Sequence, residues 1–356
     1  MSQFPVFENY RRYIGWKLFV LALSILLVPI LLCFSISMGV VRIPWSVIFS
    51  VLSGMKPEST EASILLQSRL PQALIALLAG SGLSITGTAM QAVLRNPLSS
   101  PFTLGISSAA AFGAAAVVVF GGGRIAVLDN AIMKFGFPYG SIALGAFVCS
   151  LFTAGLILLL SGKKHIKTET ILLVGVALSA FYGAGIMLLQ YIAEEQQLAA
   201  MVYWTFGDTQ RGTWPMIFAL SLLVPLFSAW YCLQSWNYNA LSLGEETARG
   251  LGVAVRRVRG LTMFLASLLT AVLVASLGII GFVGLVVPHL CRLLIGSDNR
   301  FVLPLSFFLG GSLLLLSDTA ARLVLAPRLL PVSILTAFIG APIFLLMLLK
   351  RKGSSC

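Results

Sequence analysis

The chain has 356 residues, of which 58% are hydrophobic and only 10% are charged, against about 45 to 50% and about 25% in ordinary soluble domains. This composition excludes a water-soluble globule, and five cysteines without a C-x-x-C pair indicate neither a disulfide framework nor a metal site. A formal net charge of +12 would favour nucleic acid as the partner of a soluble protein. Here, however, the basic residues form short clusters between apolar runs. The composition therefore indicates a polytopic membrane protein that binds no nucleic acid.

Helical membrane spans need about 20 apolar residues each, because the hydrocarbon core is about 30 Å thick. Eight runs fit this length: residues 17 to 38, 70 to 93, 100 to 120, 138 to 160, 170 to 193, 214 to 234, 301 to 325 and 330 to 349. The first run is longer than the apolar part of a signal peptide, about 7 to 15 residues, so we expect it to be retained as a span.

The interval from Leu261 to Cys291 is too long for one span, since it would form about 46 Å of helix at about 1.5 Å per residue. Gly278, Gly281 and Gly284 offer a turn, which predicts two spans here, the second of them short. The sequence thus predicts an all-α membrane protein with ten transmembrane helices in a single domain, residues 1 to 356.

The distribution of basic residues agrees with ten spans, because Lys and Arg concentrate in short loops on the cytoplasmic side. With the N-terminus inside, 16 of the 24 fall to the inner segments, including the cluster Lys350, Arg351 and Lys352. The other eight are Arg42, Lys56, Arg69, Arg124, Lys134, Arg211, Arg322 and Arg328. We therefore expect a multi-pass protein of the inner (plasma) membrane with both termini in the cytoplasm.

Ionisable residues inside the predicted spans are few, which disfavours an ion-coupled carrier. Asp318 is followed by Arg322 four residues later on the same helix face, which favours a self-neutralising pair over a proton relay. Ser81 lies in a stripe of small residues with Gly80, Ser84 and Thr88, a pattern typical of close helix packing rather than of a catalytic serine. With no metal-ligand spacing and no G-x-x-x-x-G-K-[ST] motif, we expect no catalytic residue, cofactor or metal site in this chain.

Two outer segments interrupt the apolar pattern. Arg69-Leu70-Pro71 opens the second span, with proline in the favourable first turn and Arg69 either as an interfacial anchor or as a docking site for an acidic partner. The loop from Glu194 to Trp214 is rich in aromatic residues, which is typical of an interface belt but also suits a short folded element at the mouth of a pathway.

The largest inner loop, residues 237 to 260, has the features of a docking element. Ser242 and Glu245 have capping-box spacing, and Gly250 and Gly252 can supply the positive φ that ends one short helix and begins another. A soluble loop has no need of an apolar side unless another protein docks there or, as the less favoured alternative, the loop rests on the inner leaflet. The apolar residues of this loop are Leu241, Leu243, Ala248 and Leu251.

At this loop the sequence resembles the permease subunits of the binding-protein-dependent ABC importers for iron siderophores, haem and cobalamin, the type II importers. The likeness covers about residues 65 to 350. The segments that carry it are Leu243-Gly244-Glu245 with Ala248-Arg249 and Leu251-Gly252, Arg69-Leu70-Pro71, Asn96-Pro97-Leu98, Gly281 to His289, and Gly340-Ala341-Pro342. The ten spans and inward termini of that family agree with the count from charge.

The resemblance implies partners and roles. Two permeases, either two copies or two homologous chains, would pack around a central pathway. Two ATP-binding cassette subunits, which use ATP and Mg²⁺, would bind on the cytoplasmic side of the membrane, and a substrate-binding protein would dock on the outer side. Contact with the ATPase is implied for Leu243, Gly244, Glu245, Ala248, Gly250, Leu251 and Gly252. Docking of the binding protein is implied for Arg69 and Arg322. Gln72 stands where some relatives carry a second arginine, so we expect this outer contact to be weaker. The pathway and its gate are implied for Thr168, Glu169, Thr170, Gly175, Ser179 and Gly183, although the last three equally suit a tight helix contact.

The expected function is ATP-driven import of a metal chelate, with a ferric siderophore first, and haem or cobalamin next. An ion-coupled carrier that works without an ATPase is the alternative, and uptake by this chain alone would reveal it. A membrane-embedded enzyme is a second alternative, which labelling of Ser81 by a serine-directed probe would support.

Overall fold

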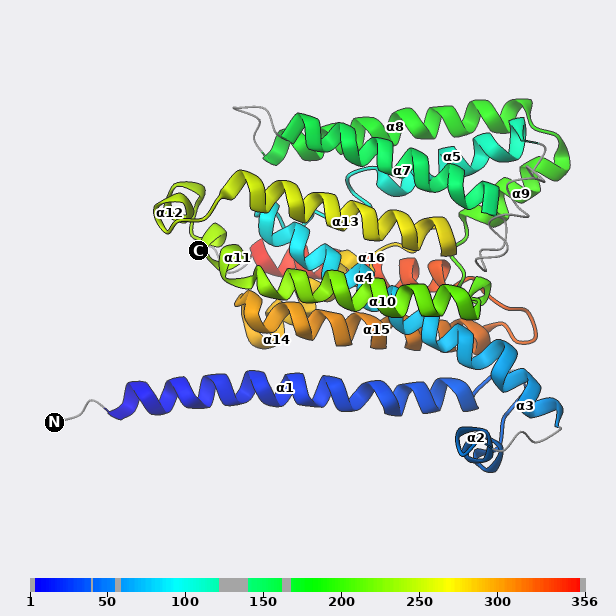
Figure 1. The fold of residues 1–356 in the computed structure, drawn as a ribbon, viewed down its shortest axis with the longest axis horizontal. Coiled ribbons are helices and arrows are strands. Elements are labelled where there is room, and N and C mark those ends of the chain that lie inside the picture. The colour runs from blue at the N-terminus through cyan, green and yellow to red at the C-terminus, as the bar shows by residue number, and fades with distance from the viewer. Residues whose placement is uncertain (1–3, 40, 55–58, 122–139, 162–167, 353–356) are drawn as a thin grey trace.

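A computed structural model of the chain describes residues 4–39, 41–54, 59–121, 140–161 and 168–352. In these ranges the chain folds into helices that run roughly side by side (Figure 1). The long helices are α1 (Phe4–Ser37), α4 (Leu70–Leu94), α7 (Gly140–Ser161), α8 (Thr168–Ile192), α10 (Trp214–Leu233), α13 (Val255–Leu277), α15 (Asn299–Val324) and α16 (Val332–Lys352). The all-α fold class predicted from the sequence is confirmed.

Seven helices in the described ranges are long and apolar enough to cross a membrane. The three other predicted spans correspond to shorter apolar helices, α5 (Ile106–Phe120), α14 (Val283–Ile295) and the Val332–Leu346 part of α16. The span predicted for residues 100 to 120 begins six residues late, because Ser100 and Thr103 hydrogen-bond each other in a turn before α5. The start of α1 and the end of α16 lie at the same end of the bundle (Figure 1), as an even number of crossings requires. The number ten itself stays a prediction.

The break predicted between residues 278 and 284 is present. Helix α13 ends at Leu277, Gly278 has a φ of +83°, and α14 begins at Val283. A side chain at Gly278 would meet the Phe206 carbonyl oxygen at 2.9 Å. The break therefore requires glycine both for its backbone conformation and for its close approach to the outer loop.

Helix α4 is the centre of the bundle. Of the 18-residue apolar window in Thr60–Leu94, 83% is buried, against 17% for the windows of α1 and α8. The predicted small-residue stripe explains this position: Gly80 contacts the Gly310 backbone of α15, and Thr88 donates to Ser306 of the same helix at 2.9 Å. The packing interpretation of the stripe is thereby confirmed.

Helix α4 begins at Leu70 with Pro71 in its first turn, as predicted, but the continuous helix that includes it begins earlier, at Thr60. Short helix α3 (Thr60–Ile64) and a π-helical turn (Leu65–Arg69) lead into α4 without interruption. Pro71 lacks the backbone N–H that a regular α-helix needs at that position, and a π-turn is one way to accommodate such a loss. Proline here modifies a continuous helix instead of starting one.

Short helices cap both ends of the bundle (Figure 1). At one end are α2 (Trp45–Leu52), α3 and α9 (Glu195–Thr205), followed by a 3-10 turn at Thr209–Arg211. Arg211 donates to the carbonyl oxygens of Tyr203 and Phe206, at 2.7 and 3.1 Å, so the predicted folded element in the aromatic loop is present. At the other end lie α11 (Ser235–Ser242) and α12 (Glu245–Gly250), which belong to the large loop of residues 237 to 260.

Candidate functional site

The loop between α10 and α13 is a helix-turn-helix element with a glycine at its turn. Gly244 joins α11 to α12 with φ +127° and ψ 153°, a backbone conformation that is essentially restricted to glycine. Gly252, with φ +83°, ends the second helix. Gly250 is helical, so the predicted positive φ is confirmed at Gly252 and wrong at Gly250.

The predicted capping box is also wrong. Ser242 donates back to the Asn239 carbonyl oxygen at 2.6 Å, because it still belongs to the last turn of α11, and the N-cap of α12 is Gly244. Glu245 instead forms a hydrogen-bonded ion pair with Arg259 of α13 and a looser one with Arg249 at 3.6 Å. The hydrogen bond from Arg259 lowers the pKa of Glu245.

The apolar residues of this loop divide into two groups. Leu241 and Ala248 have no exposed surface and join the main hydrophobic core, so the prediction of a single outward apolar side is wrong for both. Leu243 and Leu251 are 68% and 64% exposed. The loop is thus anchored by two apolar residues and offers two others to a partner.

Polar contacts fix the loop to the ends of the long helices. Tyr238 and Thr262 of α13 hydrogen-bond at 2.9 Å, and Asn239 donates to Asp298, the N-cap of α15, at 2.8 Å. Burial by itself would raise the pKa of Asp298, but hydrogen bonds from Arg300 and Asn239 outweigh it and lower that pKa to about 2. A force on this loop would therefore act on α13 and α15 directly.

At the opposite end, the two arginines predicted to dock a binding protein lie in one polar cluster. Arg322 pairs with Asp318 at 3.0 Å, which confirms the predicted self-neutralising pair. Arg69 lies close enough to both residues for electrostatic interaction, and it donates to the Met38 carbonyl oxygen at 2.9 Å.

Two residues that the sequence did not predict to contact Asp318 hold it in place. Gln72 donates to it at 2.9 Å, and Thr209 of the outer loop also donates to it. No motif marks Thr209, since its proximity to Asp318 arises from the packing of the outer loop on α4 and α15. The cluster connects three segments that are far apart in the sequence.

Both arginines are buried, with 7% of Arg69 and 2% of Arg322 exposed. Their guanidinium groups bind groups of this chain, including Ser35 of α1, to which Arg322 donates at 2.6 Å. Docking through them would require the ends of α1, α4 and α15 to rearrange. Their role in docking stays a prediction.

The residues predicted for the pathway lie on α8. The side chain of Thr168 is outside the described part of the chain, and Glu169 and Thr170 are exposed. A side chain at Gly175 would meet the Leu104 backbone at 2.7 Å, and Ser179 lies against Gly105, so these two make a tight contact with the turn before α5. Gly183 borders space that no described atom occupies within 4 Å. The structure therefore brings Gly175 and Ser179 into one contact but places Gly183 apart from it.

These features define a class of protein: a polytopic helical membrane protein with an anchored helix-turn-helix loop at one end and a buried polar cluster at the other. The model of the FecCD transport family matches residues 26–350, and the chain belongs to that family.

Similar proteins support this membership. An ABC transporter permease protein described from Methanocaldococcus jannaschii is 48% identical, covering 79% of this chain and 80% of its own length. The hemin transport system permease protein of Yersinia pestis is 36% identical, covering 93% of this chain and 96% of its own length. The vitamin B12 import system permease protein of Salmonella arizonae is 38% identical, covering 80% of this chain and 82% of its own length. A solved structure described as an inward-facing conformation of a metal-chelate type ABC transporter has a TM-score of 0.79 and 32% identity, covering 93% of this chain and 99% of that one.

Proposed function

We propose that this chain is the membrane-spanning permease subunit of an ATP-driven importer and that the loop of residues 237 to 260 transmits the motion of a separate ATPase. One observation carries the proposal: Leu243 and Leu251 are exposed on a loop that is anchored to α13 and α15. Exposed leucines on an anchored element provide both affinity for a partner and a mechanical connection to the spans.

We propose two ATP-binding cassette subunits, which use ATP and Mg²⁺, on the loop side of the membrane. A substrate-binding protein would dock at the opposite side through the cluster of Arg69 and Arg322. A second permease, identical or homologous, would complete the pathway, with α8 as its wall. The permease subunits of this family are not themselves enzymes, and we expect this one to bind no cofactor.

The proposed cargo is a metal chelate delivered from outside the cell membrane. The names of the hemin and vitamin B12 relatives and of the metal-chelate neighbour support this class. Within it we expect a ferric siderophore first, and haem or cobalamin next. A chelate that arrives in a binding protein needs a roomy pathway without strong metal ligands, because tight binding in the pathway would slow release.

Reconstitution in vesicles tests the function. The chain would be assembled with candidate ATPase and binding-protein subunits from the same organism, and uptake of radiolabelled ferric siderophore, haem and cobalamin would be measured with ATP present and absent. We expect uptake of one of the three only in the complete assembly with ATP. Uptake by the chain alone, driven by an imposed proton or sodium gradient, would replace the proposal with the ion-coupled carrier.

A further inference from the structure

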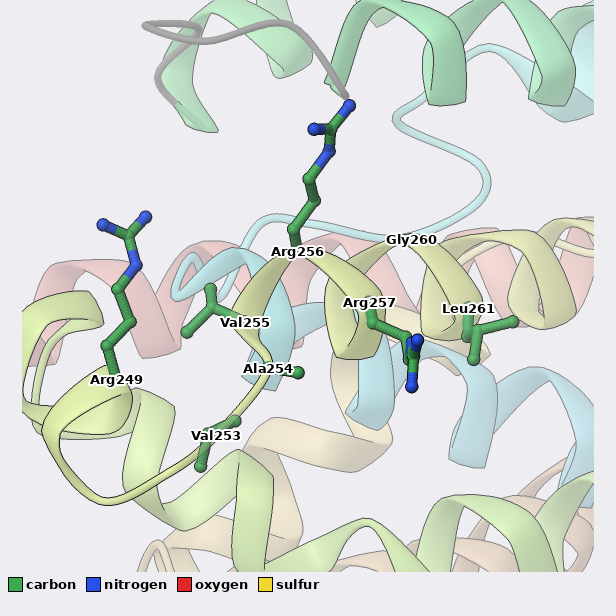
Figure 2. A pocket seen from close by; sticks show the side chains of 8 residues that line it. All are labelled: Arg249, Val253, Ala254, Val255, Arg256, Arg257, Gly260 and Leu261. Carbon is green, nitrogen blue, oxygen red and sulfur yellow. The ribbon is translucent and has the colours of Figure 1, made fainter.

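We propose that the start of α13 binds the phosphate-bearing headgroup of an anionic phospholipid of the inner leaflet. An open hollow of about 810 Å³ lies there, between α12 and the first two turns of α13. Figure 2 shows Arg249 and Arg256 extending on two sides of the segment from Val253 to Val255, with Arg257 and then Leu261 farther along the helix. The hollow is therefore lined by three arginines together with aliphatic side chains, and Arg256 and Arg257 extend in opposite directions from the helix.

The positive charge of the hollow is largely uncompensated. Arg249 has a distant ion pair with Glu245, at 3.6 Å, and its side chain is 66% exposed. Arg256 and Arg257 are exposed, and no residue of the described ranges forms an ion pair or hydrogen bond with either of their side chains. Guanidinium groups bind phosphate oxygens in a bidentate manner. An anionic phosphate is thus the complementary occupant.

The surface next to the arginines has the shape and polarity of a lipid contact. Arg257, Leu261 and Phe264 follow the i, i+4, i+7 spacing of one helix face, and the two apolar residues are 45% and 40% exposed. Leu268 continues this face and is partly buried. From Arg257 to Leu268 the helix rises about 16 Å at about 1.5 Å per residue, close to the half-thickness of a hydrocarbon core of about 30 Å. A headgroup at the arginines would place an acyl chain along this face.

The location also favours a lipid. The hollow lies at the end of the bundle where α1 begins and α16 ends (Figure 1), which the charge pattern predicts to be cytoplasmic. Farther along α13, a second hollow of about 240 Å³ is lined by Val272, Ala275 and apolar residues of α7 such as Phe147. On this face of α13, the charged residues lie at the predicted headgroup level and only apolar residues follow toward the membrane centre. A contact surface for a soluble acidic protein would not need these apolar residues.

Native mass spectrometry of the full chain, titrated with phosphatidylglycerol or phosphatidylcholine in mild detergent, tests the proposal. We expect the wild type to prefer phosphatidylglycerol and the double variant Arg256→Gln/Arg257→Gln to bind it about 30-fold more weakly. This corresponds to about 2 kcal/mol at about 1.4 kcal/mol per tenfold, from about 1 kcal/mol for each basic residue near an anionic membrane surface. Both side chains are exposed, so the melting temperature should not change.

Matched variants separate the site from general electrostatics. Arg11→Gln/Arg12→Gln removes the same charge from exposed positions of α1 and should change the affinity less than about threefold. Gly260 lines the hollow, and a Cβ there would meet no described atom within 4 Å, so a larger side chain would occupy part of the hollow; Gly155 on α7 is equally open but lies outside it. Gly260→Leu should therefore weaken phosphatidylglycerol binding at constant charge, whereas Gly155→Leu should not.

Four results would overturn the proposal. The first three are equal binding of the two lipids by the wild type, an equal effect of the two arginine pairs, and displacement of phosphatidylglycerol by millimolar inorganic phosphate, which would indicate a site for a free anion. A fourth is an arginine variant that keeps its lipid but loses the ATPase, which would assign the hollow to that partner. The lipid titration contains no ATPase, so its failure leaves the proposed transport function intact.

Discussion

Truncation of the two exposed leucines, Leu243→Ala/Leu251→Ala, should detach the ATPase without unfolding the permease. Complete burial of a leucine side chain stabilises a contact by about 1.5 to 3 kcal/mol. Because about two thirds of each side chain is exposed in the chain alone, docking can bury that share, which gives roughly 1 kcal/mol or more per leucine. The pair should therefore weaken binding of the ATPase by about 30-fold or more at about 1.4 kcal/mol per tenfold.

The affinity would be measured by surface plasmon resonance between the permease in nanodiscs and the purified ATPase, together with ATP-driven uptake. Leu222→Ala/Leu226→Ala on α10 is the matched control, since these leucines are 69% and 61% exposed but lie outside the loop. We expect both double variants to keep the wild-type melting temperature, because all four side chains are exposed. Wild-type affinity and uptake in the loop variant, or an equal loss in the control, would refute the assignment of this loop to coupling.

Three further predictions concern the backbone, the helix packing and pH. Gly244→Ala should destabilise the loop by about 1 to 3 kcal/mol, because a φ of +127° is strained for a residue with a side chain. Limited proteolysis should therefore cleave the loop faster in this variant than in the wild type, whereas Gly250→Ala, at a helical position, should not change the rate. Equal cleavage rates in the two variants would contradict this prediction. Gly310→Ala should lower the free energy of unfolding by about 1 to 3 kcal/mol, since its Cβ would lie 2.6 Å from the Gly80 carbonyl oxygen. A melting temperature no lower than that of Gly155→Ala would disprove this prediction. The pKa of Asp298, about 2 in the folded chain, lies below its unfolded value of about 3.9, so the ionised carboxylate stabilises the fold above about pH 4 and this effect declines toward pH 2. The difference in melting temperature between wild type and Asp298→Asn should therefore shrink from pH 4 to pH 2. A constant difference would argue against a stabilising role of this carboxylate.

The physical constraint of the bilayer made the fold class predictable from the sequence. Every backbone polar group in hydrocarbon must be hydrogen-bonded within the protein. An apolar run of about 20 residues meets this requirement as a helix, without knowledge of its neighbours. The break after Leu277 was likewise predictable, because the Leu261 to Cys291 interval is too long for one span and its only glycines lie between residues 278 and 284. The pair of Asp318 and Arg322 followed from helix periodicity alone.

The local details of the inner loop were not predictable, because they depend on which side of a short helix faces the core. Sequence reasoning treated Leu241, Leu243, Ala248 and Leu251 as equivalent, but contact with the core removes Leu241 and Ala248 from the surface. Ser242 has a suitable capping partner three residues later, yet α11 continues through it and the cap passes to Gly244. In a helix of six or eight residues, tertiary contacts outweigh the small energies of caps and turns.

What the sequence by itself determined is the all-α fold class, since the helical state of each long apolar run depends on composition within a single segment. Only the tertiary structure decided that Arg69, Gln72, Thr209 and Asp318 form one cluster, since these residues come from segments up to about 250 positions apart and meet through helix packing. It also decided that both predicted docking arginines are buried, because burial depends on the neighbouring helices α1, α4 and α15 and not on the residue type.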